Sequence, residues 1–74
     1  MPYASNDELP PAVAGRLPPH AQDIFREAFN HAWQSHGGDE EIAFRIAWAA
    51  VKRSYRKRGD RWVPATPARS TLSR

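Results

Sequence analysis

Two stretches in the middle of the chain carry the apolar spacing of amphipathic helices. Over residues 21–33, apolar side chains recur three and four positions apart, which predicts a helix that begins at Pro18 or Pro19 and ends near Ser35. Over residues 42–51, apolar side chains fill an arc of about 200° at 100° per residue, which indicates a helix buried on two sides. A short glycine-containing connection joins them, so the pattern predicts an antiparallel hairpin of two long helices.

The second of these helices carries signals at both ends. Asp39 is a good N-cap, and the acidic residues 40–41 lie in the first turn, where they oppose the partial positive charge of the helix dipole. We expect the helix to continue to about Lys57 or Arg58, because Gly59 is the residue that ends it.

The segments that flank the helical hairpin are short. Residues 9–14 predict a short first helix, because proline is tolerated in a first helical turn, and Gly15 and Pro18 end it quickly. Near the other end, residues 62–64 can be extended, as can residues 2–4, which allows a very short two-stranded ribbon that joins the termini. The predicted fold class is therefore mainly α.

The length of 74 residues allows one domain at most, which buries only about 60% of the surface that its unfolded chain exposes. We assign residues 1–64 to one helical domain, and residues 65–74, which are small, polar and without periodicity, to a disordered basic tail. So small a domain needs its large apolar side chains inside and leaves no room for a deep small-molecule pocket. The side chains expected in the core include Ile24, Phe29, Trp33, Ile42, Ile46, Trp48 and Val51.

Several classes of function are excluded by composition. The chain has no cysteine, and therefore no disulfide, thiolate nucleophile or sulfur-ligated metal. The apolar run of residues 46–51 is far shorter than the roughly 20 residues of a membrane span, and the N-terminus does not read as a secretory signal. We expect a cytoplasmic monomer that acts on membranes only from outside the bilayer.

Charge is distributed unevenly along the chain. Residues 1–41 hold seven carboxylates against two arginines, a net charge of −5, and the remainder holds nine Lys or Arg against one Asp, a net charge of +8. A cationic face of this kind suits nucleic acid, anionic lipid or an acidic protein surface.

The candidate partner-binding residues form a basic cluster with an interleaved aromatic residue. They are Lys52, Arg53, Arg56, Lys57, Arg58, Arg61 and Trp62. Part of this charge has a structural explanation, since cations in the last turn of a helix stabilise it against its own dipole. The excess over that need favours a surface for a protein or nucleic-acid partner.

Other candidate chemistry is weak. The three histidines lack the spacing that places two imidazoles on one helix face, so we expect no metal site; His20 should cap or pack locally, and His31 and His36 should be exposed. Asp23 and Glu27 share a helix face, but no nucleophile or concave site accompanies them, so we expect no catalytic residue and no cofactor.

Three phrases stand in order along the chain: Pro2-Tyr3 leading to Leu9-Pro10, then Leu17-Pro18 leading to His20-Ala21-Gln22, then Ala47-Trp48-Ala49 leading to Val51-Lys52. Together they resemble the ChaB family over residues 1 to about 64. The resemblance implies a compact, mostly helical domain with a small sheet and no enzymatic activity. It also implies association with a sodium, calcium or potassium:proton antiporter system, whereas viral relatives are described as DNA-binding.

The predicted function is accordingly a non-enzymatic regulatory or adaptor protein. Its basic cluster would dock on an acidic protein surface, such as the cytoplasmic face of a membrane antiporter. The alternative is a nucleic-acid-binding module that uses the same basic end of the helix.

Overall fold

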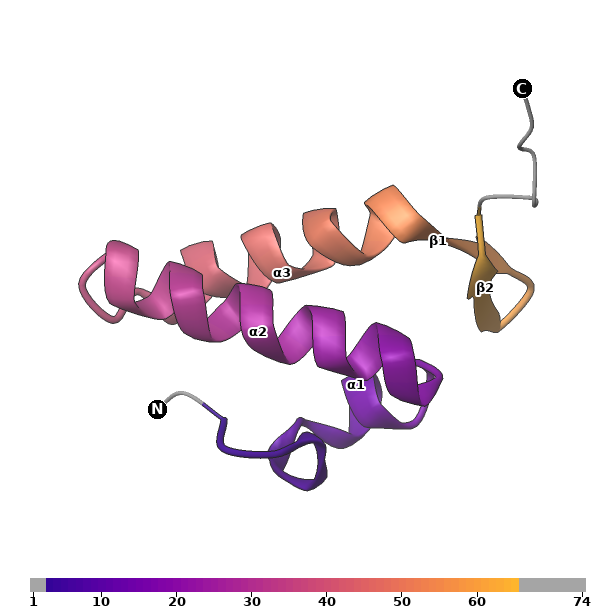
Figure 1. Cartoon of the computed structure of the whole chain (residues 1–74), viewed down its shortest axis with the longest axis horizontal. Coiled ribbons are helices and arrows are strands. Elements are labelled where there is room, and N and C mark those ends of the chain that lie inside the picture. Colours follow the sequence, from indigo (N-terminus) through magenta and orange to yellow (C-terminus); the bar gives the residue numbers. More distant parts are fainter. Residues whose placement is uncertain (1–2, 66–74) are drawn as a thin grey trace.

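The computed structural model describes residues 3–65, in which two long antiparallel helices are crossed by a short first helix and extended by a β-hairpin (Figure 1). The elements in chain order are a 3₁₀ turn η1 (Asn6–Glu8), α1 (Pro11–Ala14), α2 (Pro19–Ser35), α3 (Glu40–Ser54), β1 (Tyr55–Arg58) and β2 (Arg61–Pro64). The mainly α prediction is therefore confirmed, as is the small sheet that the resemblance implies, although its two strands are not the predicted pair. Residues 66–74 of the predicted tail lie outside the described residues, so the tail stays a prediction.

The connection between α2 and α3 follows the signals in the sequence. After α2, Gly37 and Gly38 take φ values of 66° and 84°, and the Gly38 N–H donates to the Trp33 carbonyl over 2.8 Å, as in a Schellman-type helix end. The Asp39 carboxylate then accepts a hydrogen bond from the Ile42 N–H over 3.2 Å. The predicted glycine connection and N-cap are confirmed, and they reverse the chain within a few residues.

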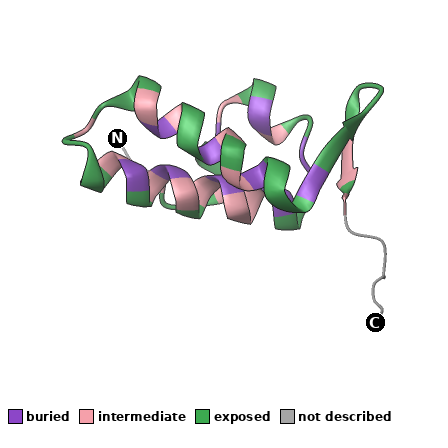
Figure 2. Cartoon of the chain, turned by 90° about the horizontal axis from the view of Figure 1, so that it is seen from above, coloured by how far each residue is buried: buried purple, intermediate pink, exposed green. Residues whose placement is uncertain are grey.

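The core lies between α2 and α3, with α1 covering one end (Figure 2). On α2, Phe25 and Phe29 are completely buried, whereas α3 contributes the small buried residues Ala43 and Ala47. Large side chains on one helix facing small ones on the other allow close approach and dense packing. The buried residues are Leu9, Val13, Leu17, Ala21, Phe25, Phe29, Ala32, Ala43, Ala47, Val51 and Tyr55.

The prediction that four aliphatic side chains are buried is right for Val51 and wrong for the three isoleucines. Val51 is fully buried, but Ile24 and Ile42 are only half-buried, and Ile46 is 38% exposed. The apolar arc of α3 is wider than the surface that α2 can cover, so α3 turns its alanines inward and leaves Ile46 on the solvent side. Ile46 is thus a surface residue.

The predicted C-terminal end of the third helix is also wrong. Instead of continuing to Lys57 or Arg58, α3 ends at Ser54, and Tyr55 takes an extended conformation with φ −133° and ψ 155°. Pairing with β2 gives the backbone of residues 55–58 its hydrogen-bond partners and buries the Tyr55 ring, which is 7% exposed. Side-chain burial and strand pairing therefore override the helical pattern here.

A ribbon between the two termini does not form in the described residues. β2 pairs with β1 instead, through a two-residue turn in which Gly59 has a φ of 67°. Closing this local hairpin costs much less loop entropy than bringing the chain ends together. Tyr3 and Ala4 lie outside any strand, and Pro2 lies outside the described residues.

The N-terminal segment is fixed by side chains of α2 instead of by a strand. Asn30 accepts a hydrogen bond from the Tyr3 N–H over 2.8 Å and donates one to the Tyr3 carbonyl over 2.7 Å, as a paired strand would. The Tyr3 ring packs on Phe29 with 4.9 Å between ring centroids, and burial, helped by the Glu40 carboxylate, raises the pKa of its hydroxyl. The segment therefore belongs to the same packed unit as the long helices.

Candidate docking surface

The basic cluster lies where α3 passes into the β-hairpin, at the end of the molecule opposite the α2–α3 connection (Figure 1). Lys52 and Arg53 occupy the last turn of α3, where each cation stabilises the helix by about 0.3–1 kcal/mol. The other four cations lie on the strands, where no helix dipole acts, and all six are exposed. Capping of α3 therefore accounts for only two of them.

Strand geometry divides the cluster between two faces of the β-hairpin. Successive side chains of a strand point to opposite faces. Because the Tyr55 ring is buried, Lys57, two residues later, lies on the face turned toward the helices, directly across from Trp62. Arg56 and Arg58 belong to the opposite face. The six cations therefore do not form one continuous row.

Two aromatic contacts join the β-hairpin to the helices. The Trp62 ring packs on Trp48 of α3, with 5.5 Å between centroids and an interplanar angle of 32°. The Tyr55 hydroxyl lies 3.1 Å from Nδ1 of His20 at the start of α2, and the two rings meet edge to face. The prediction that His20 caps or packs locally is wrong, because its ring packs on a residue distant in the sequence. These contacts set the position of Lys57 and its neighbours.

A groove lies between α1, the end of α3 and the β-hairpin, with a volume of ≈ 520 Å³. We call it the Lys-Trp groove; its lining residues are Ala12, Arg16, Trp48, Lys52, Lys57 and Trp62. Two indole rings and three cations thus meet in it, and no carboxylate lines it. The ion pairs of the described residues, Arg26–Asp23 at 3.5 Å and Arg45–Glu41 at 3.8 Å, involve none of its cations.

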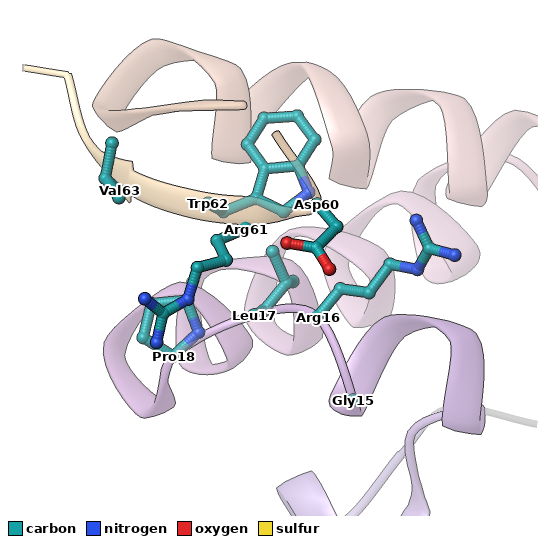
Figure 3. Close-up of a pocket in the computed structure, with 8 residues that line it drawn as sticks. All are labelled: Gly15, Arg16, Leu17, Pro18, Asp60, Arg61, Trp62 and Val63. Atoms are coloured by element: carbon teal, nitrogen blue, oxygen red, sulfur yellow. The ribbon is translucent and has the colours of Figure 1, made fainter. Parts of the chain in front are cut away.

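A neighbouring pocket of ≈ 580 Å³ lies on the other side of Trp62, against the α1–α2 connection (Figure 3). Arg61 and Trp62 leave β2 in opposite directions, with Arg61 reaching toward Pro18 (Figure 3). Arg16 and Trp62 line both hollows. Because the Asp60 carboxylate also lines this pocket, its charge is mixed, and the Lys-Trp groove is the more uniformly cationic of the two.

The loop that carries Arg16 is fixed by one side chain of α2. The Gln22 amide donates hydrogen bonds to the Ala14 carbonyl over 3.1 Å and to the Leu17 carbonyl over 2.7 Å. These two carbonyls stand on either side of Arg16 in the sequence, so the backbone that carries this arginine is held in place.

Only part of the groove is predictable from the sequence. Of the predicted residues, the structure brings together Lys52, Lys57 and Trp62, and it places Arg61 in the neighbouring pocket. The remaining three, Arg53, Arg56 and Arg58, are exposed and line neither hollow.

Three residues of the groove were missed, Ala12, Arg16 and Trp48. Trp48 was assigned to the core, although it stands four residues before Lys52 and therefore on the same helix face, which is a signal for the groove. Arg16 comes to the groove only through the tertiary fold, and no local sequence pattern predicts its position there. Of the other two aromatic residues assigned to the core, Phe29 is buried and Trp33 is half-buried against it.

The remaining polar candidates have structural explanations. Asp23 accepts a 2.7 Å hydrogen bond from the Asn6 amide and lies 3.5 Å from Arg26, and these contacts, the Asn6 bond first, lower the pKa of its carboxyl. This network ties η1 to α2. His31 and His36 are exposed, as predicted, and residues 3–65 contain no group of three His, Asp or Glu side chains placed to hold a metal ion.

None of the helices within residues 3–65 combines the length and hydrophobicity that crossing a membrane requires.

The comparisons with known proteins agree on one family. The ChaB family model matches residues 9–65. A curated relative from Escherichia coli (strain K12), named "Putative cation transport regulator ChaB", is 45% identical over 69 residues, which cover 81% of this chain and 91% of the relative. An NMR solution structure described by the same name aligns with a TM-score of 0.78 and 43% identity, covering 88% of this chain and 100% of that chain.

A viral protein is also similar. It is named "Uncharacterized protein in LEF8-FP intergenic region", comes from Lymantria dispar multicapsid nuclear polyhedrosis virus, and is 40% identical over 47 residues, 64% of this chain and 66% of its own.

Proposed function

Because this chain belongs to the ChaB family, we propose that it is a non-enzymatic regulatory protein that acts on a cation:proton antiporter and docks through its basic cluster on an acidic protein surface. The observation that carries the proposal is the gathering of six exposed cations where α3 meets the β-hairpin. The relatives are named as putative regulators of cation transport, which supports a regulatory role, and the antiporter is the partner that we propose.

The physical role of the cluster is to guide and orient the encounter. A positive patch that faces a negative one raises the association rate and disfavours wrong partners. At the cytoplasmic face of a membrane, anionic lipid adds about 1 kcal/mol of attraction for each nearby Lys or Arg. The protein would thus be drawn to its partner from outside the bilayer, with the β-hairpin end leading.

The distribution of the cations favours a protein partner over nucleic acid. A site that follows a phosphate backbone sets its cations along one track. Here Lys57 and Arg56 lie on opposite faces of the β-hairpin, and the groove adds an apolar surface beside the charge. An acidic protein surface with apolar side chains of its own matches both features.

Antiport in everted membrane vesicles tests the proposal. The vesicles come from the native cells with the gene for this chain deleted, and their proton gradient is followed with a pH-sensitive dye as Na⁺, Ca²⁺ or K⁺ is added. Purified protein should change the antiport rate for at least one cation. The variant Lys52→Gln, Arg56→Gln, Lys57→Gln should lose this effect, because it removes three cations of the basic cluster.

A control of equal net charge separates docking from overall charge. Arg45→Glu with Gln34→Glu also lowers the net charge by three, at exposed positions away from the β-hairpin, and it should act like the unchanged protein. Equal loss in both variants, or no effect of the protein on any antiport, would contradict the proposal. Submicromolar binding to duplex DNA that persists from about 50 to 200 mM salt would replace it with the nucleic-acid alternative.

A further inference from the structure

We propose that the Lys-Trp groove receives a short acidic segment of the partner, with one aromatic or large aliphatic side chain packed against Trp48 and Trp62. Carboxylates on either side of that side chain pair with Arg16, Lys52 and Lys57. The inference rests on the proposed function and deepens it, because it names the kind of segment that the surface binds.

The charge of the groove identifies the acidic part of the segment. Three cations come to it from three different elements: Arg16 follows α1, Lys52 ends α3 and Lys57 lies on β1. No carboxylate lines the groove, so its positive charge is uncompensated within it. A segment with two or three carboxylates supplies the missing counter-charge.

The indole rings identify the apolar part. Trp48 and Trp62 are both only half-buried and lie side by side in the wall of the groove. Tryptophan and arginine are among the residues most enriched in binding hot spots. The volume of ≈ 520 Å³ exceeds what one side chain needs and accommodates the flanking backbone as well.

The packing of the rings disfavours a nucleobase in the same place. Trp48 already has Trp62 at 5.5 Å between centroids and Phe25 edge-on at 5.1 Å. Base stacking needs an open ring face, and the Trp48 ring already packs against two other rings, whereas a phenylalanine or leucine side chain packs well against ring edges too. Arg56 and Arg58, which a bound nucleic-acid strand would also need, belong to the far face of the β-hairpin.

The test uses the three tryptophan indole N–H signals in ¹H–¹⁵N NMR spectra of the whole chain. Two peptides are titrated: one has a phenylalanine between two acidic residues on each side, and the other has serine in place of the phenylalanine. The first should bind at least about tenfold more tightly, because burying a phenylalanine side chain is strongly favourable. It should shift the Trp48 and Trp62 indoles, while Trp33 near the α2–α3 connection stays unchanged.

Charge variants complete the test. Arg16→Gln and Lys52→Gln should each weaken binding of the phenylalanine peptide by about two- to fivefold. The control Arg45→Gln removes the same charge from a side chain that is 76% exposed and lies outside the groove, and it should leave the affinity unchanged. A weakening equal to that of the groove variants would show attraction to net charge alone and would overturn the inference.

The other outcomes are distinct. Equal affinity for both peptides would overturn the groove while leaving the antiporter proposal intact, since charge alone would then bind. Binding of neither peptide would also overturn the inference about the groove, and the vesicle experiment would test the antiporter proposal separately. Tighter binding of a thymidine oligonucleotide, with the same two indoles shifted, would assign the groove to single-stranded nucleic acid.

Discussion

The helical hairpin and the β-hairpin of this protein are stabilised by different kinds of interaction. Between α2 and α3, Phe25 and Phe29 are fully buried, and each meets the edge or face of other aromatic rings. In the β-hairpin, Tyr55 is the one buried residue, and most of its neighbours are exposed cations. The first region is held by packing, and the second by a short backbone ladder and two aromatic contacts.

The difference separates the part of the molecule that supplies most of the packing from the part that we propose to dock on a partner. A region with few buried contacts opens at lower free energy than a packed core. The β-hairpin can therefore adjust to a partner while α2 and α3 remain folded. Substitutions in each region should therefore differ in how far their effects spread through the molecule.

The largest loss of stability is expected from a substitution at the centre of the helical hairpin. Phe25→Ala should lower the free energy of unfolding by about 3–5 kcal/mol, because it leaves a cavity that the surrounding rings cannot fill. That is much of the stability that a domain of this size possesses. Urea unfolding followed by circular dichroism measures the loss.

Ile46→Ala is the matched truncation on α3. Since Ile46 is 38% exposed, it should cost well under half as much. Comparable losses for the two variants would mean that the exposed face of α3 is covered in solution.

Alanine substitutions in the two turns should have smaller effects on stability, and the effects should differ between the turns. Gly37 and Gly59 have φ values of 66° and 67°, and at both an added Cβ meets no atom within 4 Å. Alanine at either position therefore introduces the same backbone strain, about 1–2 kcal/mol. Gly37→Ala should lower global stability by that amount, because the turn joins the two packed helices.

Gly59→Ala should instead act locally. In hydrogen exchange by NMR, the amides of β1 and β2 should lose protection severalfold, while those of α2 keep theirs. An equal loss of amide protection in α2 would show that the β-hairpin and the helices unfold as one unit. The two regions would then not differ in local stability.

The smallest effect concerns the acidic network that ties the N-terminal segment to α2. The Asn6 bond lowers the pKa of the Asp23 carboxyl, so Asn6→Ala should raise it, and Arg26→Gln should raise it less. NMR titration of the carboxyl carbon measures both. A larger rise in the arginine variant would reverse the order of the two causes.

The direction of the pH dependence follows from the lowered pKa. A carboxyl whose pKa is lower in the folded state contributes stability at pH values above its unfolded pKa. That contribution is lost as the pH falls through the folded pKa. In Asn6→Ala the acid-induced loss of stability should therefore be smaller than in the unchanged protein.

The sequence predicted the helical part of the fold well because its signals there are local and repeated. The apolar spacing over residues 21–33, the glycines at 37 and 38 and the Asp39 cap all act within a few residues of the helix ends they set. The end of α3 was predicted three to four residues too late, because burial of Tyr55 and pairing with β2 depend on tertiary contacts.

The candidate site was predictable to the extent that its charge is clustered in the sequence. Lys52, Lys57 and Trp62 were found because they are close together along the chain. Arg16 was not, since it reaches the groove only when α1 packs beside the start of α2, near the end of α3. The division of the cations between two faces likewise appears only once residues 55–58 are known to be a strand.

The two hydrogen bonds from the Gln22 amide have a consequence for recognition. They fix the carbonyls of Ala14 and Leu17, and so the backbone that carries Arg16 is already ordered before any partner arrives. Binding then restricts only the arginine side chain, and the conformational entropy lost on association is correspondingly smaller. A glutamine that touches no partner can in this way increase the affinity of the surface beside it.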